Sequence, residues 1–138
     1  MHIADRWEDF EVLDCSGGEK IERWGDYILR RPDPQVIWNT GKKGDAWKHS
    51  NATYHRSTNG GGDWDVFDLP EEWDIGYALP SGKKLTFRLK PFKFKHTGLF
   101  PEQAANGDWF SELIEKAKAE DPDREINVLN LFASTGGA

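Results

Sequence analysis

The sequence predicts an α+β protein: a mainly antiparallel β region, folded as a small barrel or a sandwich, followed by a helix and one terminal strand. Three observations lead to this fold class. Short strand-like segments separated by glycine and proline turns occupy roughly the first ninety residues. Apolar residues then recur near helical spacing over residues 104–117. A nearly continuous apolar run over residues 126–133 is typical of a parallel strand buried on both faces.

The first strands of the β region are short, and glycine and proline mark their ends. Pro32 and Pro34 interrupt any ladder because proline lacks the amide donor. The polar stretch 39–51 indicates an excursion from the sheet. Successive glycines at residues 60–62 indicate a loop, and we expect a turn at the acids of residues 63–65 that follow it. The strands expected before the glycine loop cover residues 10–13, 20–24, 26–31, 36–38 and 53–56.

The clearest hairpin joins residues 73–79 to residues 84–90. Its linker, Pro80-Ser81-Gly82-Lys83, has the residues that tight turns prefer. Along the second strand, apolar and polar side chains alternate, which predicts one buried face and one exposed face.

The helix is expected to begin at Pro101, which suits a first helical turn because its missing amide donor is not needed there. Gly107 costs roughly 1 kcal/mol relative to alanine in a helix interior, so we expect any break of the helix at that residue. Asp121-Pro122-Asp123 ends the helix, since proline cannot continue it.

The composition is that of a folded chain of one-domain size. The chain has 138 residues, of which 13% are aromatic and seven are tryptophan. Aromatic side chains supply the buried area that offsets chain entropy, which argues against disorder. The single cysteine excludes an internal disulfide framework. No apolar run approaches the ~20 residues of a membrane span and no apolar signal region is present, so we expect a cytoplasmic protein without a membrane partner.

Charge is distributed unevenly about a net value of −6. Residues 63–82 contain six acids and no Lys or Arg, whereas residues 83–96 contain six bases and no acid. Three phenylalanines lie among those bases, and bases with aromatic rings are suited to bind phosphates and stack on nucleobases. The alternative is an ordinary strand with solvated lysines and buried phenylalanines, paired to the acidic stretch. The first interpretation makes RNA a partner and Lys90, Lys93 and Lys95 the substrate-binding candidates.

Three segments resemble one family. They are residues 19–27 (EKIERWGDY), 94–106 (FKHTGLFPEQAAN) and 127–138 (NVLNLFASTGGA). They are similar to bacterial class I S-adenosylmethionine-dependent methyltransferases, in particular those that methylate large-subunit ribosomal RNA. The resemblance implies a β-rich N-terminal domain over residues 1–95. It implies that residues 96–138 are the connecting helix, the first strand and the glycine turn of a Rossmann-like methyltransferase domain.

The same resemblance implies a cofactor site for S-adenosylmethionine. A glycine turn after a buried parallel strand lets the backbone approach a nucleotide-like ligand. Ser134 and Gly107 depart from the family, which often has Tyr and Trp there. The implied cofactor-binding residues are His96, Thr97, Gly98, Phe100, Gln103, Phe132, Ala133, Gly136 and Gly137.

In such sheets the acid that binds the ribose follows the second strand, and the segment that positions the methyl acceptor follows the fourth. The printed chain contains neither of them. We therefore expect an N-terminal fragment that carries no catalytic residue and is inactive alone, and whether the chain counts as an enzyme stays open. Two alternatives remain: a β-rich module that binds RNA, and a homo-oligomer that forms through the apolar run 126–133 without activity.

Other candidate sites have weaker support. Cys15 has no basic residue nearby before Lys20 to lower its pKa, so we expect a structural thiol rather than a nucleophile. Asp63 and Asp65 are expected to shape a turn rather than hold a metal. No third ligand accompanies His49 and His55, so no zinc site is expected.

Overall fold

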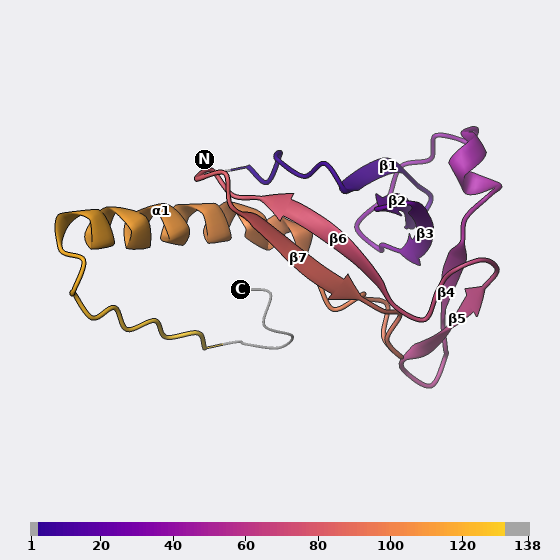
Figure 1. Ribbon diagram of the computed structural model, residues 1–138. Coiled ribbons are helices and arrows are strands. Elements are labelled where there is room, and N and C mark those ends of the chain that lie inside the picture. The colour runs from indigo at the N-terminus through magenta and orange to yellow at the C-terminus, as the bar shows by residue number, and fades with distance from the viewer. Residues whose placement is uncertain (1–2, 132–138) are drawn as a thin grey trace.

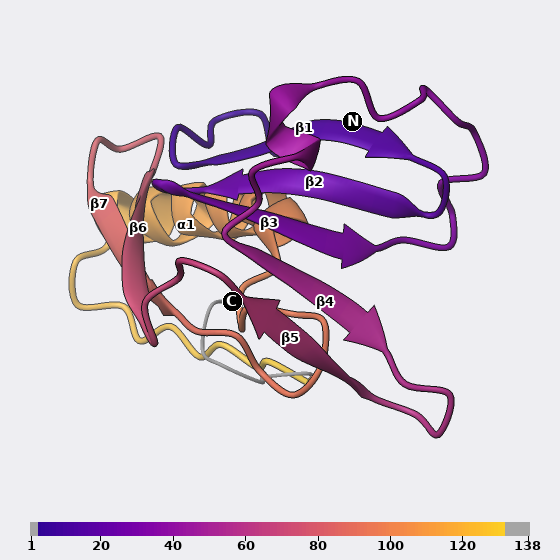
Figure 2. The same ribbon diagram turned by 90° about the vertical axis from the view of Figure 1, so that its right-hand side faces the viewer.

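The computed structural model describes residues 3–131, and it shows two sheets and one long helix (Figures 1 and 2). The larger sheet has the strand order β1-β2-β3-β4-β5, and the smaller one is the hairpin β6-β7. The helix α1 (Ala104–Glu120) follows the short 3₁₀ turn η2 (Pro101–Gln103), and a second 3₁₀ turn, η1 (Asp45–Trp47), precedes β4. The strands are β1 Phe10–Ser16, β2 Glu19–Trp24, β3 Tyr27–Pro32, β4 Ala52–Arg56, β5 Gly62–Val66, β6 Trp73–Ala78 and β7 Lys84–Leu89.

The α+β class is confirmed, but the barrel alternative is wrong for the described residues. The larger sheet is open, with β1 and β5 at its edges. The hairpin packs against this sheet through a shared core, so burial is achieved by stacking two layers rather than by closing one. The buried members of that core are Trp24, Leu29, Ala52, Trp73, Ile75, Leu89 and Leu99.

Strands β1, β2 and β3 form an antiparallel meander whose turns depend on glycine. Gly17 and Gly18 have φ values of +57° and +79°, which the two-residue turn between β1 and β2 requires. Gly25, between β2 and β3, has φ +65°, and a Cβ atom there would lie 3.2 Å from Ile75 Cγ2. A side chain at residue 25 would therefore be strained and would disturb the packing of β6 on the sheet.

Strand β4 joins β3 in parallel, with Leu29 opposite Ala52. A parallel pair needs a long crossover connection, which residues 33–51 provide. Asn51 fixes the start of β4, because its backbone amide donates to Ile28 O at 2.7 Å while its side-chain Oδ1 accepts from Ile28 N at 2.7 Å.

The crossover is held against the sheet by the buried Trp47. The indole Nε1 of Trp47 donates to Asp14 Oδ2 at 2.8 Å. The cations of Arg30 and Lys42 lie 5.5 Å and 5.0 Å from its ring centroid, within cation–π range. The polar stretch is therefore an ordered excursion.

Two segments of the β region differ from expectation. Residues 36–38 are not a strand, because the carbonyls of Val36 and Trp38 accept from the amides of the β1–β2 glycine turn and form no ladder. Residues 63–65 are not a turn but belong to β5, which pairs antiparallel with β4. The period-2 alternation explains β5, since Trp64 packs on Tyr54 with ring centroids 5.4 Å apart while the flanking acids are exposed.

The predicted hairpin is confirmed, and so is the end of the helix, whereas Pro101 begins the 3₁₀ turn η2 and the α-helix itself begins at Ala104. Strand β6 pairs with β7 from Trp73 opposite Leu89 to Ala78 opposite Lys84. Helix α1 is continuous through Gly107, so the expected break is absent, and its C-cap is Asp121. Figure 1 shows α1 beside β6 and β7, reaching past the hairpin at one end.

Residues 126–131 do not form the expected terminal strand. A parallel strand needs a neighbour on which to form hydrogen bonds, and no strand of the described residues pairs with this segment. Its apolar side chains are exposed, with Leu129 82% accessible. In Figure 1 the segment runs back along α1. Residues 132 and 133 of the expected strand lie outside the described residues.

Candidate functional site

Residues 90–100, called here the linking segment, connect β7 to η2 and are fixed by three side chains of the larger sheet. Trp64 Nε1 donates to Phe92 O at 2.8 Å, and Tyr54 Oη donates to Lys93 O at 3.3 Å. Arg31 Nη1 donates to Lys95 O at 2.8 Å. These donors come from β5, β4 and β3, so the sheet sets the position of the linking segment.

Arg31 is itself held by a buried carboxylate. Its Nε and Nη2 donate to the two oxygens of Glu22 at 2.7 Å and 2.9 Å, and the Glu22 side chain is only 1% exposed. Burial by itself raises the pKa of the Glu22 carboxyl, but the Arg31 guanidinium and the Lys20 ammonium outweigh it, so this pKa lies below its ordinary value. The bidentate pair keeps both charges satisfied inside the protein.

A cavity of about 650 Å³ lies between β7 and the beginning of α1. This volume is within the range of small-molecule sites, roughly 300–1,000 Å³. The wall is largely apolar, and the polar side chains of Gln103, Tyr77 and Ser111 also line it. Much of the apolar wall comes from Trp7, Phe87, Leu89, Phe92, Leu99 and Phe110.

Three of the cofactor-binding candidates border this cavity together: Gly98, Phe100 and Gln103. Gly98 has φ +89°, a conformation that favours glycine and leaves the backbone uncovered by a side chain. Lys90, a substrate-binding candidate, lines the same cavity. The structure thus brings part of each predicted set to one place, although nothing in the sequence indicated that Trp7 would join them.

The other two described candidates, His96 and Thr97, are not among the residues that line the cavity. Thr97 is fully buried, and its Oγ1 and the Nδ1 of His96 have no hydrogen-bond partner among residues 3–131. The His96 ring is the centre of an aromatic cluster, with centroids 5.4 Å from Phe92, 6.0 Å from Phe94 and 5.8 Å from Phe100. Buried polar atoms are usually paired, so these two are exceptions among the described residues.

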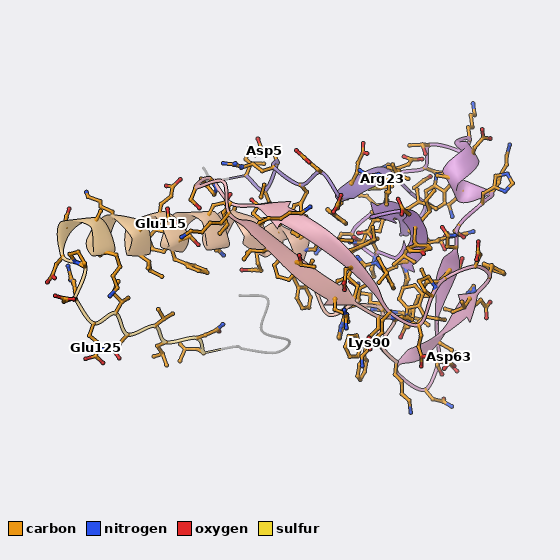
Figure 3. All side chains as sticks on the ribbon, viewed as in Figure 1. Asp5, Arg23, Asp63, Lys90, Glu115 and Glu125 are labelled. Carbon is orange, nitrogen blue, oxygen red and sulfur yellow. The ribbon has the colours of Figure 1, made fainter. Side chains whose placement is uncertain are left out.

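The three candidate lysines have different surroundings. Lys90 and Lys93 are exposed, and Lys90 Nζ lies 5.4 Å from the Phe92 ring centroid. Figure 3 labels Lys90 at the lower end of the hairpin, where the chain leaves β7. Lys95 is half-buried and donates from Nζ to Pro32 O at 3.4 Å, so its charge is directed toward the sheet.

Part of the basic stretch is paired with acids, as the alternative interpretation expected. Arg88 Nε donates to Asp74 Oδ1 of the acidic stretch at 3.0 Å across the hairpin. Lys83 Nζ is paired differently, since it lies 3.4 Å from Glu115 Oε1 on α1, outside that stretch. Basic side chains of the hairpin thus form ion pairs within the protein, whereas Lys90 and Lys93 of the linking segment are exposed.

The remaining cofactor-binding candidates, Phe132, Ala133, Gly136 and Gly137, lie outside the described residues.

Burial, followed by the neighbouring Asp14 carboxylate, raises the pKa of the half-buried Cys15 thiol, so little reactive thiolate forms at neutral pH. Among residues 3–131 no group of three or more His, Cys, Asp or Glu side chains could hold a metal ion. Helix α1 and the short turns of the same residues are not long and apolar enough to cross a membrane.

A search of solved structures gives a clear likeness. The chain is similar to an S-adenosylmethionine-dependent methyltransferase from Agrobacterium tumefaciens, with a TM-score of 0.70 and 28% sequence identity. The match covers 86% of this chain and 35% of that protein's chain. No family model and no curated protein matches the sequence. The likeness supports a relationship to S-adenosylmethionine-dependent methyltransferases.

Proposed function

We propose that this chain is the β-rich portion of an S-adenosylmethionine-dependent methyltransferase that acts on RNA in the cytoplasm. The observation that carries the proposal is the likeness to a methyltransferase of known structure over most of the chain. The cavity supports it, because Gly98, Phe100 and Gln103, which the sequence resemblance assigned to the cofactor, line it together.

The cavity residues suit one side of such a cofactor. When bound, S-adenosylmethionine supplies a methyl group on a positively charged sulfur. Phe100 and its apolar neighbours would shield that sulfur from water. Gln103 would offer its side-chain amide for a hydrogen bond to the cofactor, and Gly98, which has no side chain, would let the backbone approach the cofactor closely. Their part in catalysis is positioning, since a transferred methyl group and its acceptor must lie in line.

We propose further that the 138-residue polypeptide does not transfer methyl groups by itself. In open α/β sheets, ligands bind in the crevice outside the carboxyl ends of the strands. Residues 126–131 form no ladder, so residues 3–131 do not assemble such a crevice. The cavity would thus form one border of a cofactor site whose remaining wall comes from other strands.

A chimera tests the relationship. The N-terminal part of the Agrobacterium methyltransferase that matches this chain would be replaced by residues 1–138, and S-adenosylmethionine binding would be measured by calorimetry. We expect the chimera to bind the cofactor and to label ribosomal RNA from methyl-tritiated S-adenosylmethionine, whereas the 138-residue polypeptide does neither. A folded chimera that binds no cofactor would contradict the proposal, and micromolar binding by the polypeptide alone would contradict the incomplete site.

A second candidate function is RNA binding by the β-rich region itself. The observation that favours it is the exposure of Lys90 and Lys93 beside the exposed ring of Phe94. Phosphate contacts release counterions, so the affinity for RNA should fall as salt is added. Affinity that does not change with salt would exclude this candidate.

A further inference from the structure

We propose that Phe94 and Phe100, with His96 between them, form a stacking platform for the bases of single-stranded nucleic acid, and that Lys90 and Lys93 contact its phosphates. The inference rests on the RNA-binding part of the proposed function. It adds that the nucleic acid bound is single-stranded, and it names the side chains that select it over a duplex.

The two phenylalanine rings of the platform are exposed, and the half-buried His96 ring contacts both of them. Phe94 is 61% exposed and Phe100 is 46% exposed. The planes of Phe94 and His96 lie within 12° of each other, with centroids 6.0 Å apart, and His96 is 5.8 Å from Phe100. Exposed aromatic rings of this kind are the common feature of sites that bind single strands without sequence preference.

Hydrogen bonds from the larger sheet hold the backbone of the platform on both sides of Phe94. The donors are the side chains of Trp64, Tyr54 and Arg31, and the acceptors are backbone carbonyls. The buried Glu22 carboxylate in turn fixes Arg31. A platform ordered in the free protein loses little entropy on binding, which favours affinity.

The charges around the platform favour an anion. Lys90 and Lys93 have no carboxylate within ion-pair distance in the part of the chain that the structure describes. Asp63 and Asp65 of β5 are near in sequence to Trp64, but neighbouring side chains of a strand point to opposite faces. Because Trp64 reaches the linking segment, the two acids belong to the other face, and Asp65 there contacts His55 at 3.0 Å.

Single strands are the form that suits this surface. In a duplex the faces of the bases are stacked on one another, so aromatic side chains cannot reach them. Unpaired bases have free faces, and each base that stacks on an aromatic ring adds about tenfold or more to affinity.

The test measures fluorescence anisotropy of labelled RNA with the 138-residue protein. The probes are a single-stranded oligoadenylate and a duplex of equal charge. We expect Phe94→Ala to weaken single-strand binding about tenfold and Phe94→Tyr to preserve it. Phe67→Ala is the matched control, because Phe67 is also an exposed phenylalanine, 69% accessible, but follows β5 next to Asp68.

The lysines are tested by the slope of affinity against salt. Lys93→Glu should weaken binding and reduce that slope by about one phosphate contact, whereas Lys48→Glu, at an exposed lysine near η1, should have little effect. Circular dichroism would confirm that each variant is folded.

Three results would overturn the platform. The first is an equal loss of RNA affinity in Phe94→Ala and Phe67→Ala. The second is equal affinity of the protein for the duplex and for the single strand. The third is that heparin, which has charge without bases, displaces the single strand as well as unlabelled single-stranded RNA does. RNA binding that depends on salt but is unchanged by Phe94→Ala would contradict the platform and still support RNA binding by the β-rich region. No RNA binding at all would reject both, while the chimera still tests the methyltransferase relationship.

Discussion

Glu22 and Arg31 illustrate what a single pair of side chains does in this protein. Both lie inside the sheet layer, and Trp24 adds contacts, since its ring lies 5.2 Å from the Arg31 guanidinium. A buried pair of this kind is not by itself evidence of high stability, because removing two charges from water offsets much of their attraction. The pair matters because Arg31 continues to Lys95 O and so orients the linking segment.

Replacing Glu22 should reveal this dependence. Glu22→Gln leaves the Arg31 guanidinium buried without a counter-charge, and we expect the free energy of unfolding to fall by about 3 kcal/mol at pH 7. Urea unfolding followed by tryptophan fluorescence measures it. Glu71→Gln, at an exposed carboxylate, is the control and should change stability by less than about 0.5 kcal/mol. Equal effects of the two variants would contradict the assigned role.

The same carboxylate makes stability depend on pH. The pKa of Glu22 is lowered in the folded state, so its contribution is complete above the unfolded value of about 4.3 and is lost as pH falls through the folded pKa. We expect the wild-type protein to lose stability on acidification toward pH 3, and Glu22→Gln to lose less. Urea titrations from pH 7 to pH 3 compare the two, and parallel curves would exclude Glu22 as a source of the acid dependence.

Replacing Gly107 should raise the stability of the protein rather than lower it. It is the fourth residue of α1, and a Cβ atom there would meet nothing within 4 Å. Gly107→Ala should therefore stabilise the protein by about 0.5–1 kcal/mol, because alanine loses less backbone entropy in a helix. Thermal unfolding measures the gain. A lower midpoint would show that residue 107 needs the freedom of glycine.

At the scale of elements, the position of α1 on the hairpin depends on a few polar contacts. Tyr77 Oη donates to Asp108 Oδ2 at 2.7 Å, and Trp7 Nε1 donates to Pro101 O at 2.9 Å. Burial, followed by the hydrogen bond to Asp108, raises the pKa of the Tyr77 hydroxyl well above its ordinary value, so it stays a donor at any physiological pH. Trp7 and Tyr77, which make these contacts, also line the cavity.

Tyr77→Phe tests the contact between β6 and α1. It leaves the half-buried Asp108 carboxylate without this donor, and we expect a loss of about 2 kcal/mol. Amide exchange should become faster at the start of α1. Tyr27→Phe is the matched control, since Tyr27 packs edge-on against Trp73 and its hydroxyl has no hydrogen-bond partner within residues 3–131. Equal exchange rates in the two variants would show that packing alone holds the helix.

The elements that the sequence predicted correctly are those with local causes. The hairpin at Pro80-Ser81-Gly82 and the helix that follows Pro101 and ends before Asp121 depend on turn residues and on spacing within one segment. Strand β5 was missed because its two acids resemble a turn until the position of Trp64 against Tyr54 is known. The run at residues 126–133 was predicted as a strand, although no partner strand lies beside its described part, residues 126–131. A strand needs a partner, and a single-sequence pattern does not show whether one is present.

The candidate site was predicted in part for the same reason. Gly98, Phe100 and Gln103 lie within a few residues of one another, so one segment was enough to find them. Trp7 reaches the same cavity from far away in the sequence, and only the fold places it there. Lys95 differs from Lys90 and Lys93 through its contact with Pro32 O on β3, which no local pattern shows.

At the scale of the whole molecule, the surface combines a net charge of −6 with an apolar segment at residues 126–131. Leu129 is the most exposed of its apolar side chains, and an uncovered apolar segment tends to associate. We propose that copies of the chain associate through this segment. Sedimentation equilibrium should show a species heavier than the monomer, and Leu129→Lys together with Leu131→Lys should reduce it. Ile37→Lys, at another exposed apolar residue, is the control; a wild-type monomer at all concentrations would contradict the proposal.

The parallel pairing of β3 with β4 has a consequence for the order in which the sheet assembles. Strands β1, β2 and β3 are joined by tight turns, so their contacts are local and close quickly, whereas β4 must wait for residues 33–51 to close a loop. Within residues 3–131, Leu29 and Arg30 are the two residues of β3 with register partners on β4, and Asn51 adds its hydrogen bonds at the edge. We expect the junction to be the late step of folding. Because β4 and β5 carry two of the three donors that hold the linking segment, the surface around Phe94 would take shape last, and pulse-labelled hydrogen exchange should find the amides of β4 protected after those of β2.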